Sequence, residues 1–232
     1  VVNAAVADGA GGFYIGGTFT HVGGEVRHGL ARVNADGSLH AWDPDANGEV
    51  YDLLALNWMM YAGGYFTQIG GNDLPFLAEI DPSTGAPSAW QPPLNGGVRH
   101  LVTDGTDLYI SGDFTQIDGN VRRQLGAFTI PAHTLMAWDP NVTGNVVLSF
   151  HTGSSFIIGG SFFAVGGQPR SNIAEIAADG SVTAWAPESD ASVTALAFDG
   201  TSVFAGGYFS NIGGADRSGL VALDPLTGLV TS

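Results

Sequence analysis

Arginine recurs at one place in a sequence pattern that runs through this chain in five copies. Four copies carry it, as Arg27, Arg122, Arg170 and Arg217, whereas the second copy has Leu74. A ring of guanidinium groups could bind carboxylates or acidic sugars. Repetition in nearly every copy favours a structural interpretation instead, in which each arginine ties its own loop to a nearby aspartate or carbonyl.

A second recurring position carries amide and imidazole side chains. It lies four residues after each glycine pair and holds His21, Gln68, Gln116, Ala164 and Asn211. These groups could hydrogen-bond sugar hydroxyls, with one shallow site per copy, or they could cap their own loops. Together with the arginines they are the candidate ligand-binding residues.

One short stretch resembles the start of a calcium-binding loop. In DPDANGEV, the residues Asp43, Asp45, Asn47 and Gly48 are in register with such a loop, but the bidentate acid would fall at Leu54. A turn is the better interpretation. We therefore predict no cofactor, with calcium near Asp43 as the weak alternative.

Signatures of an enzyme are lacking. The six histidines show no metal-ligand spacing, and the chain has neither G-x-S-x-G nor a phosphate loop. Glu79 and Glu175 occupy the same place in two copies, so we expect both on the outer surface. The prediction is that the chain is not an enzyme. A glycoside hydrolase or lyase, with paired carboxylates at a channel mouth, is the less favoured alternative.

The pattern itself is a repeat with a fixed period. YIGGTFTHVGG returns as YAGGYFTQIGG, YISGDFTQIDG, IIGGSFFAVGG and FAGGYFSNIGG, and one glycine marks the steps, which are 47, 48, 48 and 47 residues: Gly17, Gly64, Gly112, Gly160 and Gly207. Tryptophan keeps the same period at Trp42, Trp90, Trp138 and Trp185. Such a period is typical of repeat architectures.

Each repeat contains four short runs that have strand character. The runs are rich in β-branched or aromatic residues, and Asp-Gly or Thr-Gly turns separate them. Four antiparallel strands repeated five times predict an all-β chain that forms a five-bladed β-propeller. We expect one domain over residues 1–232, with repeats at roughly 1–47, 48–95, 96–143, 144–190 and 191–232.

Strand direction alternates, so the loops sort onto two faces. The tight turns between the first and second runs, and between the third and fourth, share one face. The longer loops, typified by HVGGEVRH at His21 and DPDANGE at Asp43, share the other. Binding sites usually lie on the longer loops of a rigid scaffold. We therefore expect any site there, or at the channel mouth on that face.

The segment YIGGTFTHVGGEVRHGLARVNADGSLHAW resembles the delta-sixty type of propeller repeat found in large secreted bacterial proteins. The glycine pair followed by tryptophan also resembles kelch repeats. The likeness extends over the whole chain, although tryptophan stands where that family would have phenylalanine. The resemblance implies a secreted or cell-surface propeller and brings no catalytic residues.

Composition narrows the partners. The formal net charge is −15, and all seven basic residues are arginine. Such a surface repels nucleic acid and anionic lipid, so neither is an expected partner, and no apolar run is long enough for membrane insertion. We expect a non-enzymatic structural or binding module, extracellular or at the cell surface, that meets a protein or glycan surface. A multivalent lectin is the alternative. We also expect flanking domains, with tryptophan as the residue after Ser232.

Overall fold

The computed structural model describes residues 1–231, apart from the side chains of residues 147–149, and its regular structure is entirely β. The chain forms two compact units. The first comprises Val1–Ile110, Phe114–Val121 and Phe128–Leu135, and the second comprises Ser111–Asp113, Arg122–Ala127 and the described residues from Met136 onward. The single domain expected from the sequence stays a prediction. No helix among the described residues is long and apolar enough to cross a bilayer.

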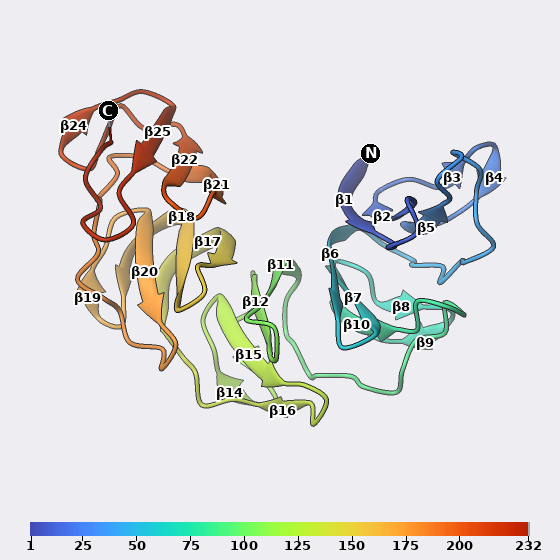
Figure 1. The fold of residues 1–232 in the computed structure, drawn as a ribbon. Helices are drawn as coiled ribbons and strands as arrows, with labels where there is room; N and C mark the ends of the chain where they lie inside the picture. The colour runs from blue at the N-terminus through green and yellow to red at the C-terminus, as the bar shows by residue number, and fades with distance from the viewer. Residues whose placement is uncertain (232) are drawn as a thin grey trace. The chain divides into compact units, whose positions relative to one another are not determined.

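The first unit contains two three-stranded antiparallel sheets that correspond to the first two repeats (Figure 1). Their strand orders are β1-β2-β5 and β6-β7-β10. The strands of the first sheet are β1 (Val2–Ala7), β2 (Phe13–Gly17) and β5 (Leu30–Val33). Those of the second are β6 (Val50–Leu56), β7 (Met59–Gly64) and β10 (Leu77–Ile80).

The third repeat forms a four-stranded sheet of order β11-β12-β15-β16. Its strands are β11 (Val98–Thr103), β12 (Leu108–Gly112), β15 (Leu125–Thr129) and β16 (Thr134–Leu135).

The last two repeats, which lie in the second unit, form one sheet each. In the fourth, β18 (Ser155–Val165) pairs with β17 (Val142–His151), β19 (Gln168–Pro169) and β20 (Ile173–Ala177). In the fifth, the order is β21 (Val193–Phe198), β22 (Val203–Gly207) and β25 (Leu220–Leu223).

Small hairpins sit in the longer loops after the glycine pairs. They are β3 (His21–Val22) with β4 (Glu25–Val26), β8 (Gln68–Ile69) with β9 (Asn72–Asp73), β13 (Gln116–Ile117) with β14 (Asn120–Val121), and β23 (Asn211–Ile212) with β24 (Ala215–Asp216). In the fourth repeat the corresponding loop is absorbed into β18, which runs on to Val165.

The predicted fourth strand is much shorter than expected. Outside the third sheet, it is reduced to single bridges such as Val33 with Leu39. In two repeats the tryptophan that follows is bonded to the next repeat. The Trp42 indole N–H donates to the carbonyl of Asp81 in the second repeat (3.0 Å), and Trp185 does the same to Asp224 (3.1 Å).

Glycine and aromatic residues form the core as the sequence predicts. A Cβ on Gly16 would lie 2.7 Å from Cγ1 of Val50, so the second repeat packs directly against the first sheet's backbone. Trp42, Trp138 and Trp185 are buried, whereas Trp90 is half-buried. Among the described residues, clusters of buried apolar side chains lie in both units, around Trp42 and Leu108 in the first and around Trp185 in the second.

Candidate functional site

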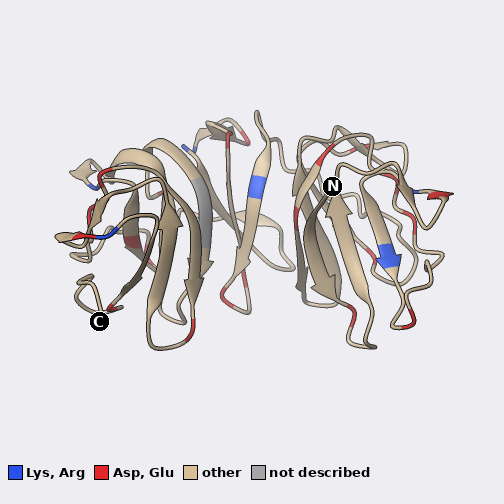
Figure 2. Ribbon diagram, turned by 90° about the horizontal axis from the view of Figure 1, so that it is seen from above, with Lys and Arg blue, Asp and Glu red and all other residues tan. Residues whose placement is uncertain are grey.

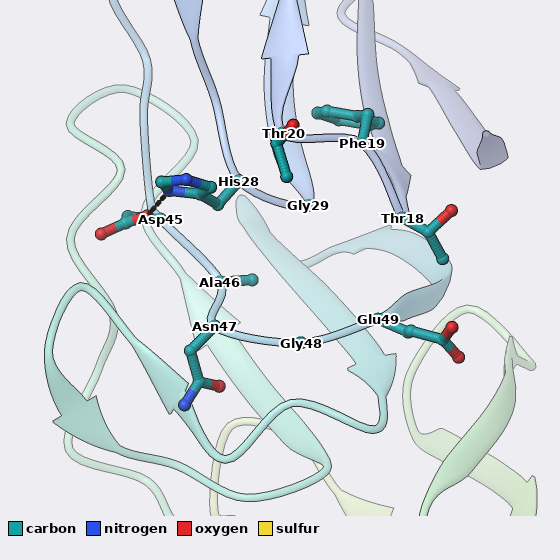
Figure 3. A pocket seen from close by; sticks show the side chains of 10 residues that line it. All are labelled: Thr18, Phe19, Thr20, His28, Gly29, Asp45, Ala46, Asn47, Gly48 and Glu49. Carbon is teal, nitrogen blue, oxygen red and sulfur yellow. Dashed lines mark hydrogen bonds and ion pairs between the residues drawn. The ribbon is translucent and has the colours of Figure 1, made fainter.

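A cavity of about 560 Å³ opens in the first unit, where the loops of the first two repeats meet (Figure 3). Its walls come from the loop after β2, from the start of β5, and from the segment that leads into β6. These are the longer loops on which the sequence places a site. The lining residues are Thr18, Phe19, Thr20, His28, Gly29, Asp45, Ala46, Asn47, Gly48 and Glu49.

Polar side chains stand at the two ends of the cavity (Figure 3). At one end, Nδ1 of His28 lies 2.7 Å from Oδ1 of Asp45. At the other end is Glu49, whose Oε2 accepts a hydrogen bond from the Tyr51 hydroxyl (2.5 Å). That bond, followed by burial, raises the pKa of Tyr51. The two ends therefore offer an imidazole and two carboxylates.

Between the ends, the lining includes three small residues, namely Gly29, Ala46 and Gly48, with Asn47 between the last two (Figure 3). Gly29 has φ of +67°, and Phe76 holds the same repeat position with φ of +72°. Both backbones are left-handed at this position, so the second repeat places a phenyl ring where the first has a hydrogen.

A counterpart of this cavity exists in the second unit. It has a volume of about 380 Å³ and lies at the same repeat positions of the fourth and fifth repeats, with Asn172 in the place of Gly29. Asn172 also has a left-handed backbone, with φ of +68°, and its Nδ2 donates to the Ser189 carbonyl (2.8 Å). Equivalent positions thus give a cavity in both units.

The predicted ring of polar groups does not line these cavities. Nε2 of Gln68 donates to Asp73 (2.8 Å), and Nδ2 of Asn211 donates to Asp216 (3.1 Å), in each case across its own two-residue hairpin. His21 lies 3.1 Å from the Thr20 hydroxyl through Nδ1. Gln116 stands exposed on β13.

Three of the four candidate arginines lie against backbone carbonyls two residues before a tryptophan. Arg27 donates to the His40 carbonyl (3.3 Å), Arg122 donates to that of Met136 (3.0 Å), and the last pair is Arg170 with Thr183. Arg27 and Arg122 also pair with Asp43 (3.3 Å) and Asp139 (3.7 Å).

Arg217 differs from the other three arginines. It is exposed, and the bond that it makes is to the carbonyl of its neighbour Asp216 (3.1 Å). It also lines a hollow of about 280 Å³ in the fifth repeat, beside Phe204 and Leu220.

The calcium-like stretch uses its side chains separately. Asp43 pairs with Arg27, and Asp45 pairs with His28. Oδ1 of Asn47 accepts from the backbone N–H groups of Thr67 and Gln68 (2.8 and 2.9 Å). The described residues hold no group of three or more histidine or acidic side chains suited to a metal ion. Absence of calcium stays a prediction.

The expected exposure of Glu79 is wrong. It is buried, with 6% of its surface exposed, and its Oε1 accepts from the Tyr61 hydroxyl (2.7 Å). Nε2 of His133 lies 3.2 Å from the same oxygen, and the His133 ring stacks on Trp90 at a centroid distance of 4.5 Å. Glu175 is half-buried, with hydrogen bonds from Ser155 and Thr183. Neighbouring segments cover positions that repeat equivalence alone places outside.

Acidic side chains outnumber basic ones on this chain, and the arginines are scattered rather than clustered. Figure 2 shows many of the acidic residues in turns and loops and only scattered arginines. The turn aspartates mostly serve their own turns, as Asp36, Asp81 and Asp199 do by accepting from N–H groups two residues on. This acidity therefore comes mainly from turn chemistry.

Comparison with known proteins supports a β-propeller family. The family described as "Domain of unknown function (DUF5122) beta-propeller" matches residues 14–39 and 157–182, in the first and fourth repeats. No curated protein matches the chain in sequence. The likeness to delta-sixty or kelch repeats in particular stays a prediction.

Solved structures share the fold at low identity. The computationally designed Ika8 protein is 14% identical with a TM-score of 0.61, over 100% of this chain and 61% of that one. The extracellular domain of a putative hybrid two-component system from B. thetaiotaomicron is 14% identical with a TM-score of 0.63, over 100% and 27%. The Neurospora crassa Pan2 WD40 domain is 10% identical with a TM-score of 0.55, over 88% and 59%.

These likenesses establish the fold and no more. The chain spans less than two thirds of the length of each of these three proteins. The all-β, propeller-type architecture predicted from the sequence is therefore confirmed. Five blades and closure into a ring stay predictions.

Proposed function

We propose that this chain is a non-enzymatic binding module of a secreted or cell-surface protein, and that it holds a protein or glycan ligand at the cavity of the first two repeats. The observation that carries the proposal is the cavity itself. It has polar groups at both ends, and three small residues contribute to the lining between them. Its volume is within the range of ligand pockets, roughly 300–1,000 Å³. The extracellular placement rests on the sequence resemblance, and one structural neighbour is itself an extracellular domain.

The test fills the cavity with a residue that the fold already accepts elsewhere. Gly29→Phe copies Phe76, which has the same left-handed backbone. A Cβ on Gly29 would lie 3.1 Å from Ala46 Cβ and from the Gly48 carbonyl oxygen, so a small adjustment is needed. Gly37→Asn is the control, since Gly37 is also left-handed and has nothing within 4 Å of its Cβ position.

Each variant is applied to a glycan array and to a panel of cell-surface proteins. We expect Gly29→Phe to lose a ligand that the parent and Gly37→Asn both retain, while its melting temperature stays well above that of the assay. Equal binding by all three chains would rule out the cavity. Hydrolysis of an array glycan by the parent would favour the glycosidase alternative.

A multivalent lectin is the second candidate, and the counterpart cavity in the fourth and fifth repeats favours it. Two sugar sites on one chain would give avidity well above that of either site. Gly29→Phe combined with Asn172→Phe should then abolish binding to a dense glycan surface, whereas each single change should only weaken it. If one of the single changes abolishes binding by itself, the result would indicate one sugar site rather than two.

The same proposal includes closure of the five repeats into a five-bladed ring. In the first four repeats, the residue that opens the third run is buried, as for Leu30, Leu77 and Ile173 at 0% exposed, whereas Leu220 is 69% exposed. Closure would cover this face of the fifth repeat. Leu220→Asp should then destabilise the chain strongly, because a buried unpaired charge is costly. Leu226→Asp is the control at an exposed turn, and equal melting of the two variants would argue against closure.

A further inference from the structure

The turn between β6 and β7 carries a tryptophan in a left-handed backbone. Asn57 and Trp58 form this two-residue turn, with φ of +49° and +65°. Counted from the glycine pairs, Gly105, Gly153 and Gly200 hold the place of Asn57, whereas Thr106, Ser154 and Thr201 hold the place of Trp58 and have no positive φ. A bulky residue with positive φ is a backbone outlier. Such strain is retained where the surroundings or a function require it.

Trp58 packs almost nowhere on its own chain. It is 96% exposed, whereas Trp42, Trp138 and Trp185 are 1%, 5% and 4% exposed. A tryptophan that is almost fully exposed adds little packing energy to the fold, so packing does not offset the strain. Large exposed aromatic rings are typical of recognition surfaces.

A hollow of about 330 Å³ lies beside the ring, in the same unit. Ala7, Leu56, Met59 and Met60 contribute apolar walls, and Asp8 and Pro82 contribute oxygen atoms. Asp8 is held in place, because Arg32 donates to its Oδ2 through Nε and Nη2 (3.1 and 2.8 Å). One side chain that lines the hollow is therefore held in a fixed position by hydrogen bonds.

Asn57 supplies the polar partner of the ring. It is exposed, and among the described residues its side-chain amide makes no hydrogen bond. An amide offers two donors and an acceptor. The turn therefore presents a flat apolar face and an adjacent donor–acceptor group to the same solvent.

We propose that Trp58, Asn57 and the adjoining hollow form a binding site for a neutral saccharide, with a pyranose ring stacked on the indole and its hydroxyls bonded to Asn57. A pyranose with equatorial substituents has an apolar C–H face and a polar rim, which match this pair of groups. The net charge of −15 disfavours acidic polysaccharides. A flat protein partner is a poorer fit, because a stable interface buries roughly 1,200–2,000 Å², while Ala55 and Asn57, which flank this ring, are small or polar.

This site is separate from the cavity proposed above. The hollow reaches Tyr14 near the start of β2, whereas the cavity begins at Thr18 after the end of that strand. Either proposal can fail without the other, and the variants that test them differ.

The experiment uses the exposure of Trp58 as its signal. Cellohexaose, xylohexaose and laminarihexaose are titrated into the parent chain while acrylamide quenching of tryptophan is followed. We expect at least one of these oligosaccharides to shield Trp58 and shift its emission to shorter wavelength. Affinity is then measured by calorimetry for Trp58→Gly and Asn57→Ala.

Glycine adopts the left-handed backbone of Trp58 without strain, so the melting temperature of Trp58→Gly should equal or exceed that of the parent. Its affinity for the same oligosaccharide should fall at least tenfold, and that of Asn57→Ala should fall severalfold. Gly29→Phe should bind like the parent. The proposal is overturned if none of the three oligosaccharides binds, if Trp58→Gly binds equally well, or if Gly29→Phe alone loses binding, which would place the sugar in the cavity.

Discussion

Cγ1 of Val98 lies 2.7 Å from the point where a Cβ on Gly63 would stand. The third repeat therefore packs its first strand onto bare backbone of the second, within the first unit. Gly16 and Val50 repeat this relationship one repeat earlier, at the same distance. The first glycine of these two pairs is thus a packing position, where a side chain would meet the next repeat.

Gly63→Ala should lower the free energy of unfolding by about 1–3 kcal/mol, because the added methyl overpacks a filled space. Val98→Ala removes the atoms that the methyl meets and leaves a cavity of its own. The double variant should lose less free energy of unfolding than the two single variants lose when added together. Chemical denaturation of the parent, the two single variants and the double variant would measure this. Simple additivity would show that the two positions do not share this space.

Strand positions follow well from the sequence, because they depend on local signals. The first three runs of each repeat, bounded by glycine and aspartate turns, coincide with long strands such as β6 and β7. The fourth run is shorter than predicted, and the Trp42 side chain that follows it in the first repeat is bonded to Asp81, in another repeat. A prediction that considers only neighbouring residues in the sequence cannot include that interaction.

One residue explains why the strands β17 and β18 of the fourth repeat are long. In the second and third repeats the amides of Asn47 and Asn95 accept backbone N–H groups of the loop after the glycine pair, which ends the strand. The fourth repeat has Thr143 in that place, and Thr143 pairs directly with Ala164 as β17 and β18 continue. Sequence spacing alone gives no weight to this exchange.

Prediction of the site succeeded for the loops and failed for most residues. His28 and Asp45 meet across 17 positions, and local sequence patterns do not show such a long-range pair. The polar ring predicted from His21 and its counterparts relied on recurrence, which records how a repeat is built more than where it binds. Trp58 was detectable in principle, since it departs from both the tryptophan period and the turn pattern.

Acid should weaken the fold through the turn aspartates, and Asp104 is the clearest case. Burial works to raise its pKa, but hydrogen bonds from Asp107 and Thr106 prevail and lower it to about 2. A depressed pKa contributes stability above the unfolded value near 4, and that contribution is lost as the pH falls toward 2. Asp104→Asn should therefore melt lower than the parent at pH 7 and depend less on pH between 5 and 2. Asp118→Asn, an exposed position outside these turns, is the control. Parallel melting curves for parent and Asp104→Asn would contradict the assignment.

Alkali should act through Tyr61. Burial, followed by the hydrogen bond to Glu79, raises the pKa of this phenol far above 10. A raised pKa means that the stabilisation is complete below the unfolded value near 10 and is lost as the pH rises beyond it. Tyr61→Phe should cost about 1–3 kcal/mol at pH 7, because Glu79 loses a buried donor, and should flatten the decline above pH 10. Tyr208→Phe, at an 81% exposed position, should change neither. A decline as steep in Tyr61→Phe as in the parent would point to other groups.

Calcium should be dispensable. Asp43 and Asp45 are engaged by Arg27 and His28, and the ligand position of a calcium loop falls at Leu54. Melting curves recorded with EDTA and with added calcium should therefore coincide within about a degree. A fall of several degrees in EDTA would show a metal site that these pairs conceal.

The arginines of the longer loops should act on stability rather than on binding, and two of them form a matched pair. Arg170 is half-buried and donates to the carbonyls of Pro169 and Thr183, so it joins its loop to the segment before Trp185. Arg217 is exposed and bonds to its neighbour Asp216. Arg170→Ala leaves a carbonyl without its donor and should lower the free energy of unfolding by about 1–3 kcal/mol. Arg217→Ala loses the same charge at the same repeat position and should cost far less. If Arg170→Ala melts like the parent but loses a ligand that Arg217→Ala keeps, then Arg170 serves recognition and the structural interpretation of this repeated arginine is wrong.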